Sequence, residues 1–251
     1  MSKILYFDIE SAPNLGYTWG KYEQNVLSYE REGYMLCYAY AWNDGKVKVV
    51  SLTDFATFEK DQTNDYELVK SLWELLNEAD IVIAHNAKQF DIKYTNGRFL
   101  KHDLPPPENY QVVDTLLVAR NKFKLNSNKL DDLGKLLNLG GKKETGGFEL
   151  WLGCMANNDH SWSKMKKYNK HDVVLLRDVY KKLRGWMTKH PNINVIDQAV
   201  DEPRCGICKS DHVVKKGFEP LGNQIRQRWK CRECGANLYT SIKGVMPLKS
   251  A

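Results

Sequence analysis

Apolar residues are arranged in short runs in the first half of the chain. Residues 3–9 alternate weakly and predict a strand, and residues 35–42 and 46–52 predict two more. Asn43-Asp44-Gly45, between the last two runs, is typical of a hairpin turn. The compact run at 81–84 is typical of a strand buried on both faces. These segments predict a sheet that begins near the N-terminus.

Later segments repeat apolar residues at helical spacing. The first such stripe, at 68–79, predicts a helix that begins near Asn64, with Glu67 three residues further on. The longest stripe, from Val173 to Met187, predicts a helix that begins near Ser161 or Ser163 and stops before His190. Helices are also predicted near 88–101, 115–121 and 130–137, a strand at 111–113, and a glycine-rich loop at 140–147. The order of strands and helices predicts the α/β class, with a mixed sheet flanked by helices.

Charge divides the chain more sharply than composition does. The net charge of the 251 residues is +6, yet residues 203–251 hold ten lysines and arginines against three acidic side chains. We therefore predict a near-neutral domain at 1–190, a linker at 191–203 and a basic module at 204–251. A basic appendage on a neutral domain favours a polyanionic partner such as nucleic acid, although a merely soluble tail has the same composition.

The expected compartment is the cytoplasm. No run approaches the roughly 18 apolar residues that a membrane span needs, and the N-terminal run contains Asp8, unlike a signal peptide. Cys37 and Cys154 stand alone among apolar neighbours and are expected as buried small side chains. We expect no membrane partner.

Four carboxylates and a tyrosine lie near the ends of predicted elements. Asp8 and Glu10 are two apart on a strand, so both project from one face. Asp91 follows the run 81–84 near a helix start, and Tyr168 and Asp172 are one turn apart on the last helix. Each cluster alone has an ordinary surface or capping explanation. Together, converging carboxylates need cations, and a pair of Mg²⁺ or Mn²⁺ ions is typical of phosphodiester chemistry.

The same clusters carry a family resemblance. Phe7 to Glu10 reads F-D-I-E, His85 to Asp91 reads H-N-x3-F-D, and Tyr168 to Asp172 reads Y-x3-D. These motifs resemble those of the DEDD superfamily of 3′–5′ exonucleases, which has a ribonuclease H-like fold. With Tyr168 in the third motif, the chain resembles most the tyrosine subgroup, which is found in polymerase proofreading domains. The stretch 17–42 also looks like stand-alone bacteriophage members.

The resemblance implies two-metal hydrolysis that releases nucleoside 5′-monophosphates. It implies that Asp8 bridges two ions, that Glu10 and Asp172 complete one site, that Asp91 supports the other through water, and that Tyr168 orients the attacking water. It favours DNA over RNA. An exoribonuclease, a structure-selective endonuclease and a non-catalytic nucleic-acid-binding or recruitment protein on the same fold remain alternatives, and replication or repair proteins are possible partners.

Smaller roles are assigned to residues near these motifs. Asn86 is expected to fix the Asp91 loop or to touch the terminal nucleotide. Asp114 is expected as a helix cap or as a support for the metal ligands. Lys164, one turn before Tyr168, is a candidate phosphate contact or part of a solvated basic face. The loop at 140–147 is a substrate flap or a simple connection.

The basic module carries a metal-binding spacing. Cys205 and Cys208 form one C-x2-C pair and Cys231 and Cys234 another, which predicts a closed tetrahedral site for one structural Zn²⁺. A redox pair is the minor alternative, and His212 is a possible substitute ligand. The four-thiolate set leaves no open position for catalysis, and so small a module needs the metal to fold.

Residues 224–231 predict a strand with one basic face. Arg226, Arg228 and Lys230 alternate with other residues and are candidate phosphate-backbone contacts. The run 228–235 resembles the zinc ribbons of transposases and transcription factors. Trp229 is expected mainly in the small core, with base stacking as the alternative. The ribbon is thus predicted to bind nucleic acid, unless it docks a protein or only stabilises the chain.

Overall fold

The computed structural model describes all residues except 23–24, 143, 199–202, 222–223 and 242–251. A mixed sheet of five strands in the order β5-β4-β1-β6-β7 forms its centre. β1 runs parallel to β6 and antiparallel to β4, and β6 runs parallel to β7. The strands are β1 (Ile4–Ser11), β4 (Met35–Trp42), β5 (Lys48–Ser51), β6 (Ile81–Ala84) and β7 (Gln111–Asp114). The predicted hairpin is confirmed, because β4 and β5 pair on either side of Asn43, which has a positive φ of 47°.

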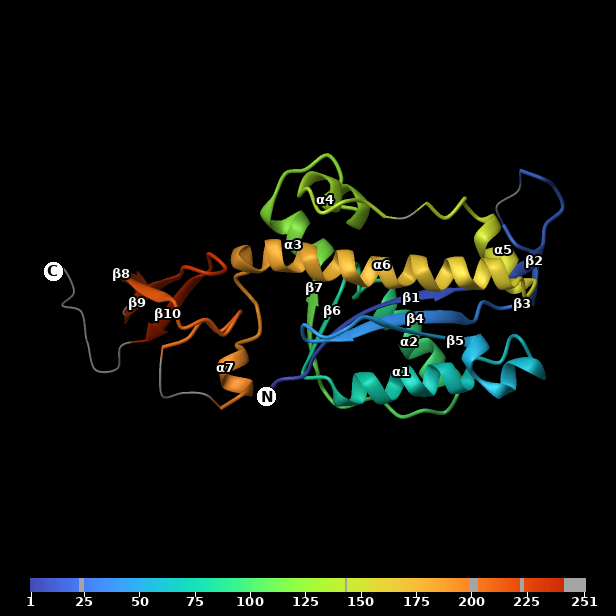
Figure 1. Cartoon of the computed structure of the whole chain (residues 1–251), viewed down its shortest axis with the longest axis horizontal. Coiled ribbons are helices and arrows are strands. Elements are labelled where there is room, and N and C mark those ends of the chain that lie inside the picture. The colour runs from blue at the N-terminus through green and yellow to red at the C-terminus, as the bar shows by residue number, and fades with distance from the viewer. Residues whose placement is uncertain (23–24, 143, 199–202, 222–223, 242–251) are drawn as a thin grey trace.

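Helices cover both faces of the sheet (Figure 1). α1 (Tyr66–Glu78) and α2 (Asp91–Lys101) lie on one side, and the long α6 (Asp159–Leu183) crosses the other. Around α6 lie α3 (Thr115–Lys122), α4 (Leu130–Leu136) and α5 (Glu149–Met155). The predicted mixed sheet flanked by helices is confirmed. None of the described helices combines the length and apolar character that crossing a bilayer requires.

The alternation of β1 divides the core and aims the acidic residues. Leu5 and Phe7 pack into one apolar cluster together with residues of α1, whereas Ile4 and Tyr6 join a second cluster with α6. Because side chains alternate along a strand, Asp8 and Glu10 continue the row of Ile4 and Tyr6. The face of β1 that packs on α6 therefore changes from apolar to acidic along its length.

Two helix starts differ from the prediction. α6 begins at Asp159, where the Asn158 side chain accepts a hydrogen bond of 2.9 Å from the Ser161 backbone N–H. An asparagine cap thus replaces the predicted serine. α1 begins at Tyr66, two residues after Asn64.

Several elements were not predicted because they lack a clear period. These are a hairpin of β2 (Leu15–Tyr17) and β3 (Ser28–Arg31), helix α5, the short helices η1 (Leu52–Asp54), η2 (Ala56–Glu59) and η3 (Arg184–Trp186), and α7 (Ile193–Ile196). The last of these lies within the segment predicted as a linker. Its Ile193 backbone N–H donates to Gly206 O at 2.7 Å, so this part of the segment is folded against the C-terminal module.

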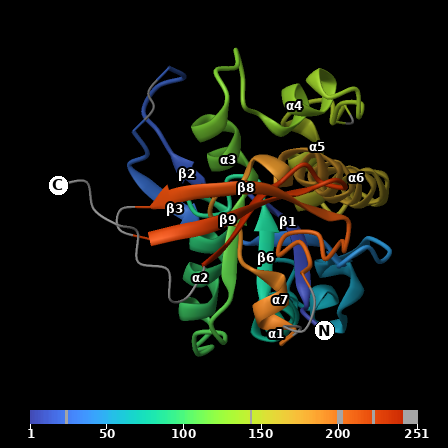
Figure 2. The same ribbon diagram turned by 90° about the vertical axis from the view of Figure 1, so that its left-hand side faces the viewer.

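The C-terminal module is a three-stranded antiparallel sheet in the order β10-β9-β8. Its strands are β8 (Val213–Leu221), β9 (Gln224–Cys231) and β10 (Asn237–Ser241). β9 covers the strand predicted at 224–231. Figure 2 shows this small sheet across the end of the main domain at which β1 begins. A side chain at Gly185 would place its Cβ 1.9 Å from Cys234 O, so glycine permits the two backbones to meet there.

Candidate active site

The acidic face of β1 and the middle of α6 form one cluster. Ligand oxygens of Asp8, Glu10 and Asp172 all lie within 4.8 Å of one another. Asp172 is fully buried, and its Oδ1 is a buried atom with no hydrogen-bond partner in the described part of the protein. A buried, unsatisfied carboxylate oxygen is costly unless a cation approaches it. Three hard oxygen donors in this arrangement fit a Mg²⁺ or Mn²⁺ ion.

Asp91 lies beside this cluster but not within it. It is the first residue of α2 and is buried, with 2% of its surface exposed. Its charge raises the pKa of Asp8, second only to burial, and so the two carboxylates are neighbours. The structure therefore brings all four predicted carboxylates to one end of β1, with Asp91 approaching from the α2 side.

Burial raises the pKa of each carboxyl group in the cluster. For Asp8, burial acts together with the neighbouring Asp91 and Glu10. Burial, followed by repulsion from Asp172, raises the pKa of Glu10 to about 8. Burial raises the pKa of Asp91 to about 7, although backbone N–H groups oppose the shift. Without divalent ions, neighbouring carboxylates resist ionisation, and bound cations remove this penalty.

Lys142 supplies the positive charge that the sequence analysis missed. Its Nζ donates a short hydrogen bond to Asp172 Oδ2 and another of 3.1 Å to Tyr168 Oη. Burial alone would lower the pKa of Lys142, but Asp172 and Asp8 raise it above the ordinary lysine value. The only signal in the sequence was that this basic loop separates two predicted helical regions.

The loop that carries Lys142 is anchored at several points. The Lys142 backbone N–H donates to Asp131 Oδ1 at 2.6 Å, and Gly141 O lies 2.8 Å from His171 Nε2 on α6. Gly140, with φ of +87°, supplies a turn that favours glycine. The loop at 140–147 was predicted as a substrate flap or a simple connection. A simple connection does not explain why Lys142 is held among the carboxylates.

Two further residues fix the carboxylates and had no sequence signal. Asn169 Nδ2 on α6 donates to Asp8 Oδ2 at 2.8 Å and so orients that carboxylate. The Trp151 side chain on α5 hydrogen-bonds Glu10 and lowers its pKa, against the effect of burial. Its ring meets that of Tyr168 edge-on, with centroids 6.3 Å apart. Trp151 was missed because α5 itself was not predicted.

Asp114, Asn86 and Lys164 had each been given two alternative roles. Asp114 caps α3 by accepting from the backbone N–H groups of Leu116 and Leu117, and it also accepts from Asn86 N at 3.0 Å. It therefore caps a helix and also supports the loop that leads to Asp91. Asn86, with a φ of 70°, occupies a left-handed turn in that loop. Lys164 is half-buried, and its Nζ would lie 3.5 Å from a Cβ at Gly146.

The four predicted cysteines converge in the C-terminal module. Ligand sulfurs of Cys205, Cys208, Cys231 and Cys234 lie within 4.8 Å of one another. Sγ–Sγ distances of 3.6 Å for two of the pairs exclude disulfide bonds. The hydrogen bond between Cys205 and Cys208 lowers the pKa of Cys208 and raises that of Cys205, and burial raises the pKa of Cys234 to about 11. A coordinated Zn²⁺ would overcome these shifts, because a metal-bound thiol loses its proton. Four sulfur donors fit a closed structural Zn²⁺ site, and exposed His212 lies outside the group.

The basic face of β9 lines a groove of about 490 Å³. Arg228 donates to Lys216 O at 2.9 Å, and Lys230 donates to Asn237 Oδ1 at 3.3 Å. Arg226 pairs with Glu219 at 3.2 Å, so its charge is partly neutralised. The residues lining the groove are Lys216, Glu219, Arg228, Trp229, Lys230, Arg232, Asn237 and Tyr239.

The sequence analysis expected Trp229 mainly in the core of this module, and this prediction is wrong. It is half-buried, and its Nε1 donates to Thr240 Oγ1 at 3.0 Å while Lys215 lies over its ring. The buried core of the module consists instead of two cysteines, an isoleucine and an alanine. A core this small relies on bound metal for stability.

The mixed sheet, with converging carboxylates at the end of its central strand, defines the fold class of the protein as RNase H-like. Residues 5–184 match the model of the RNase H superfamily. This match spans more than half of the chain, which therefore belongs to the RNase H superfamily. No curated protein matches the sequence.

Among solved structures, the chain is similar to the family B DNA polymerase from the hyperthermophilic archaeon Pyrobaculum calidifontis. The TM-score is 0.52 at 17% sequence identity, over 73% of this chain and 24% of the polymerase chain. The protein thus spans about a quarter of the length of that polymerase. At this identity the likeness shows a shared fold.

Proposed function

We propose that the protein is a metal-dependent 3′–5′ exonuclease that hydrolyses nucleic acid, DNA in preference to RNA, to nucleoside 5′-monophosphates. The observation that carries the proposal is the convergence of Asp8, Glu10 and Asp172 within 4.8 Å, with Asp91 beside them. The direction of cleavage and the preference for DNA rest on the resemblance of the three motifs to the tyrosine subgroup of DEDD exonucleases.

Asp8, Glu10 and Asp172 would hold one divalent ion, and Asp8 together with Asp91 would hold a second. When bound, such ions neutralise the carboxylates, activate the attacking water and offset the charge that develops on the transferred phosphoryl group. Asn169 keeps Asp8 in place through its hydrogen bond of 2.8 Å. Trp151 restrains Glu10 in the same way.

Tyr168 and Lys142 supply hydrogen-bond donors and charge beside the carboxylates. Burial raises the pKa of the Tyr168 phenol, so its hydroxyl stays protonated and can orient a water for attack. Lys142 Nζ lies 3.1 Å from that hydroxyl and also contacts Asp172. Divalent ions bound to Asp172 would displace the Lys142 ammonium, which would then be free to pair with a phosphate oxygen of the substrate.

The C-terminal module would aid binding rather than chemistry. Its four thiolates form a closed set, and its groove presents Arg228 and Lys230 beside Trp229. Side chains of this kind neutralise phosphates without reading sequence. The module meets the main domain at Gly185, beyond the C-terminal end of α6, whereas Asp172 lies in the middle of that helix.

Time courses on end-labelled strands test the proposal. Single- and double-stranded DNA and RNA are incubated with Mg²⁺ or Mn²⁺, with and without chelator. We expect metal-dependent, stepwise loss from the 3′ end, faster on DNA. Faster loss from RNA would identify an exoribonuclease, and internal cuts an endonuclease. The absence of any cleavage would leave only a nucleic-acid-binding role.

A matched pair of variants ties cleavage to the carboxylates. Asp8→Ala should abolish cleavage and keep the fold, because Asp8 is shared between the two proposed ion sites. Asp54→Ala removes an exposed aspartate that pairs with Lys166 and should cleave as the wild type does. An Asp8→Ala protein that cleaves at the normal rate would refute the site.

A further inference from the structure

Strand β10 (Asn237–Ser241) forms an open edge of the small C-terminal sheet. It pairs with β9 on one side only. In the described part of the protein, no hydrogen bond joins the backbone of these five residues to a group outside β9. A free strand edge presents a row of N–H and C=O groups that pair readily with another strand.

The opposite edge of the same sheet is protected against such pairing. β8 contains Lys215, Lys216 and Pro220, and its register with β9 shifts between Lys215 and Phe218. Lysines, proline and bulges on an edge strand hinder the addition of another strand. β10 has the sequence Asn-Leu-Tyr-Thr-Ser, without a charged residue or a proline. Of the two edges, therefore, only β10 is open to a further strand.

A groove of about 650 Å³ follows the open edge of β10. Four consecutive residues of the strand, from Asn237 to Thr240, line this groove. Because successive side chains of a strand project to opposite faces, a groove that touches all four passes along the edge. The four residues offer about 13 Å of edge to an extended segment.

The opposite wall of the groove comes from α7 and the residues before the first cysteine. Asn194 and Val195 of α7 line it together with Pro203 and Arg204, and Val195 is 66% exposed. Figure 2 shows α7 beside the small sheet, at the end of the main domain where β1 begins. The groove is thus formed jointly by the segment 191–203 and the C-terminal module.

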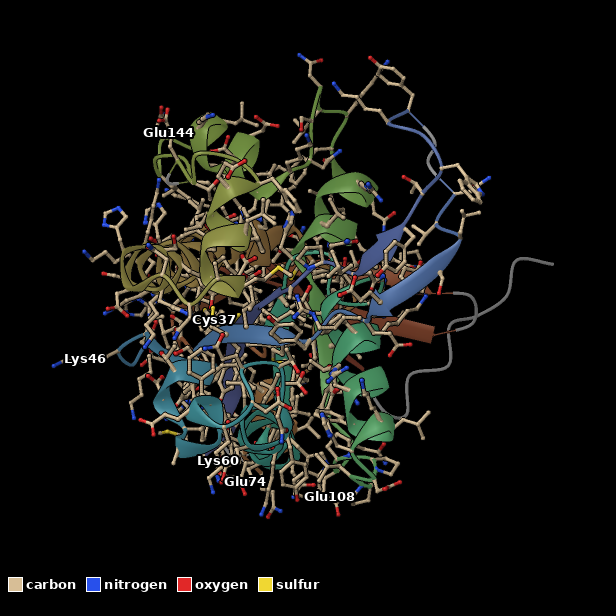
Figure 3. All side chains as sticks on the ribbon, turned by 90° about the vertical axis from the view of Figure 1, so that its right-hand side faces the viewer. Cys37, Lys46, Lys60, Glu74, Glu108 and Glu144 are labelled. Carbon is tan, nitrogen blue, oxygen red and sulfur yellow. The ribbon has the colours of Figure 1, made fainter. Side chains whose placement is uncertain are left out.

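The position of the groove keeps it apart from the carboxylates. Asp8 and Glu10 lie towards the C-terminal end of β1, whereas the module lies where β1 begins. In Figure 3, which looks from the end that carries α5 and the β2–β3 hairpin, the module lies behind the main domain. A molecule bound in the groove would leave the carboxylate cluster accessible.

The lining of the groove is poor in charge. Arg204 is the only charged residue among its described lining, because burial lowers the pKa of His190 and keeps that ring neutral. The apolar residues that line it include Met187, Ile207, Val213 and Leu238. The groove on the basic face of β9, in contrast, has four lysines and arginines. Nucleic acid binds through several neutralised phosphates, so the groove along β10 fits a peptide better.

The charge around the groove indicates the charge of its partner. Residues 203–251 hold ten lysines and arginines against three acidic residues. Lys215 lies over the ring of Trp229, which lines the groove, with Nζ 5.5 Å from the ring centroid. A positive module attracts a segment that carries acidic residues beside its apolar centre.

We infer that this groove binds an extended segment of a partner protein, apolar at its centre and acidic at both ends, which adds to β10 as a fourth strand of the small sheet. The backbone of β10 supplies the hydrogen bonds, and alternate apolar side chains of the segment enter the groove. The inference goes beyond the proposed nuclease function. It gives the module a protein-binding edge in addition to its basic face.

A synthetic peptide tests strand addition directly. The probe is a fluorescent nonapeptide with five alternating valines and threonines between two pairs of aspartates, titrated into the full-length protein with Zn²⁺ present. We expect saturable binding with a Kd below about 100 μM. The absence of saturation up to about 1 mM would overturn the inference.

Methylated forms of the probe show whether its backbone is recognised. Two further peptides carry N-methyl groups on alternate amides, one set on each edge of the extended chain, and keep every side chain. One of the two should bind at least about tenfold more weakly, because it cannot donate to β10. Equal affinities of all three peptides would exclude strand addition.

A matched pair of variants locates the peptide. Val195→Asp puts a negative charge in the apolar wall and should weaken peptide binding about tenfold. Leu136→Asp makes the same kind of change at a residue of α4 that is 60% exposed and lies outside the groove, and it should bind as the wild type does. Equal affinities of the two variants would place the peptide elsewhere and refute the site.

Two other occupants give different results in the same titrations. If Val195→Asp weakens labelled single-stranded DNA as much as the peptide, the groove belongs to nucleic acid and the inference fails. A chain that ends at Ser241 should bind the peptide within about twofold of the full-length protein. Binding at least about tenfold tighter would assign the groove to residues 242–251 of this chain, and it would equally overturn the inference.

Discussion

The ammonium of Lys142 lies against the carboxylate of Asp172, at the one place where Asp8 and Glu10 also converge. A flexible side chain from the loop between α4 and α5 thus contributes positive charge to a site built for divalent ions. This relationship connects the loop, which the sequence analysis interpreted as a substrate flap or a simple connection, to the chemistry of the site.

Removing this ammonium should change both metal affinity and turnover. In Lys142→Met no positive charge competes for Asp172, and we expect Mn²⁺ to bind about tenfold more tightly. Turnover at saturating Mn²⁺ should fall, because Tyr168 loses its hydrogen bond and the substrate loses a cation. Calorimetry and single-turnover cleavage measure the two effects. Lys164→Met, one turn before Tyr168 on α6, should leave metal affinity unchanged, and an unchanged affinity in Lys142→Met would refute the competition.

Stability should depend on pH in opposite ways with and without divalent ions. Burial raises the pKa of Glu10 from 4.5 to about 8, so between these values the unfolded chain loses a proton that the folded protein keeps. The unfolded state then binds fewer protons, and the free energy of unfolding falls as pH rises through this window. Ions that bind the ionised cluster reverse this loss.

The melting temperature measures that difference. The increase in melting temperature on adding Mg²⁺ should be larger near pH 8 than near pH 5, by at least about 2 °C. Glu10→Gln removes the titrating group and should reduce the difference. Equal increases at both pH values would show that Glu10 is ionised in the folded protein even without metal.

Zinc should hold the C-terminal module together. Cys231 is 1% exposed within a core of four residues, so Cys231→Ser should abolish zinc binding and leave the module unfolded. Zinc content falling to zero and rapid proteolysis within 204–251 would be the measured outcomes. Cys154→Ala, at a cysteine in the main domain, should retain zinc. A protease-resistant module without zinc would contradict the structural role.

The junction between the two parts should be sensitive at Gly185. A Cβ there would lie 1.9 Å from Cys234 O, and because that atom belongs to the backbone, the module must move. We expect Gly185→Ala to destabilise the protein by about 1–3 kcal/mol in thermal or urea unfolding. Gly97→Ala, on α2 with nothing within 4 Å, is the matched control and should be neutral or stabilising by about 1 kcal/mol. Similar effects of the two variants would exclude a tight junction.

The benefit of the basic groove should depend on substrate length. Asp172 lies 11 residues before Leu183, the last residue of α6, a distance of about 17 Å along the helix. A strand needs about five nucleotides to span this length, and the groove lies beyond Leu183, so only longer strands reach it. Arg228→Ala with Lys230→Ala should raise KM several-fold on longer strands, lower its salt dependence, and leave shorter strands unaffected. Lys60→Ala with Lys70→Ala on the α1 side is the matched control, and an effect that is equal at all lengths would refute a remote contact.

Strands and helices with a clear hydrophobic period were predictable. The alternation in β1, the turn at Asn43 and the stripe of α6 each follow from local sequence. The β2–β3 hairpin and α5 were not, because their residues show no such period and their stability comes from contacts elsewhere. The asparagine cap of α6 was also missed, since a serine nearby suits the same role.

The residues of the candidate site also fall into those that the sequence indicated and those that it did not. The strand and helix periods place Asp8 with Glu10, and Tyr168 with Asp172, each pair on one face. The five residues as a set, Asp91 included, were expected from the resemblance of the three motifs. Lys142, Asn169 and Trp151 had no comparable signal. Their roles depend on the packing of a loop and two helices around β1, which spacing along the chain does not encode.

The sequence by itself determined the α/β class, the acidic and cysteine motifs and the excess of positive charge at the C-terminal end, because these depend on composition and on short-range spacing. Only the tertiary structure decided which groups meet: Lys142 against Asp172, the C-terminal module against Gly185, and the edge of β10 beside α7. The physical reason is that such contacts join residues far apart in the chain, and their geometry is set by how helices and strands pack on the sheet.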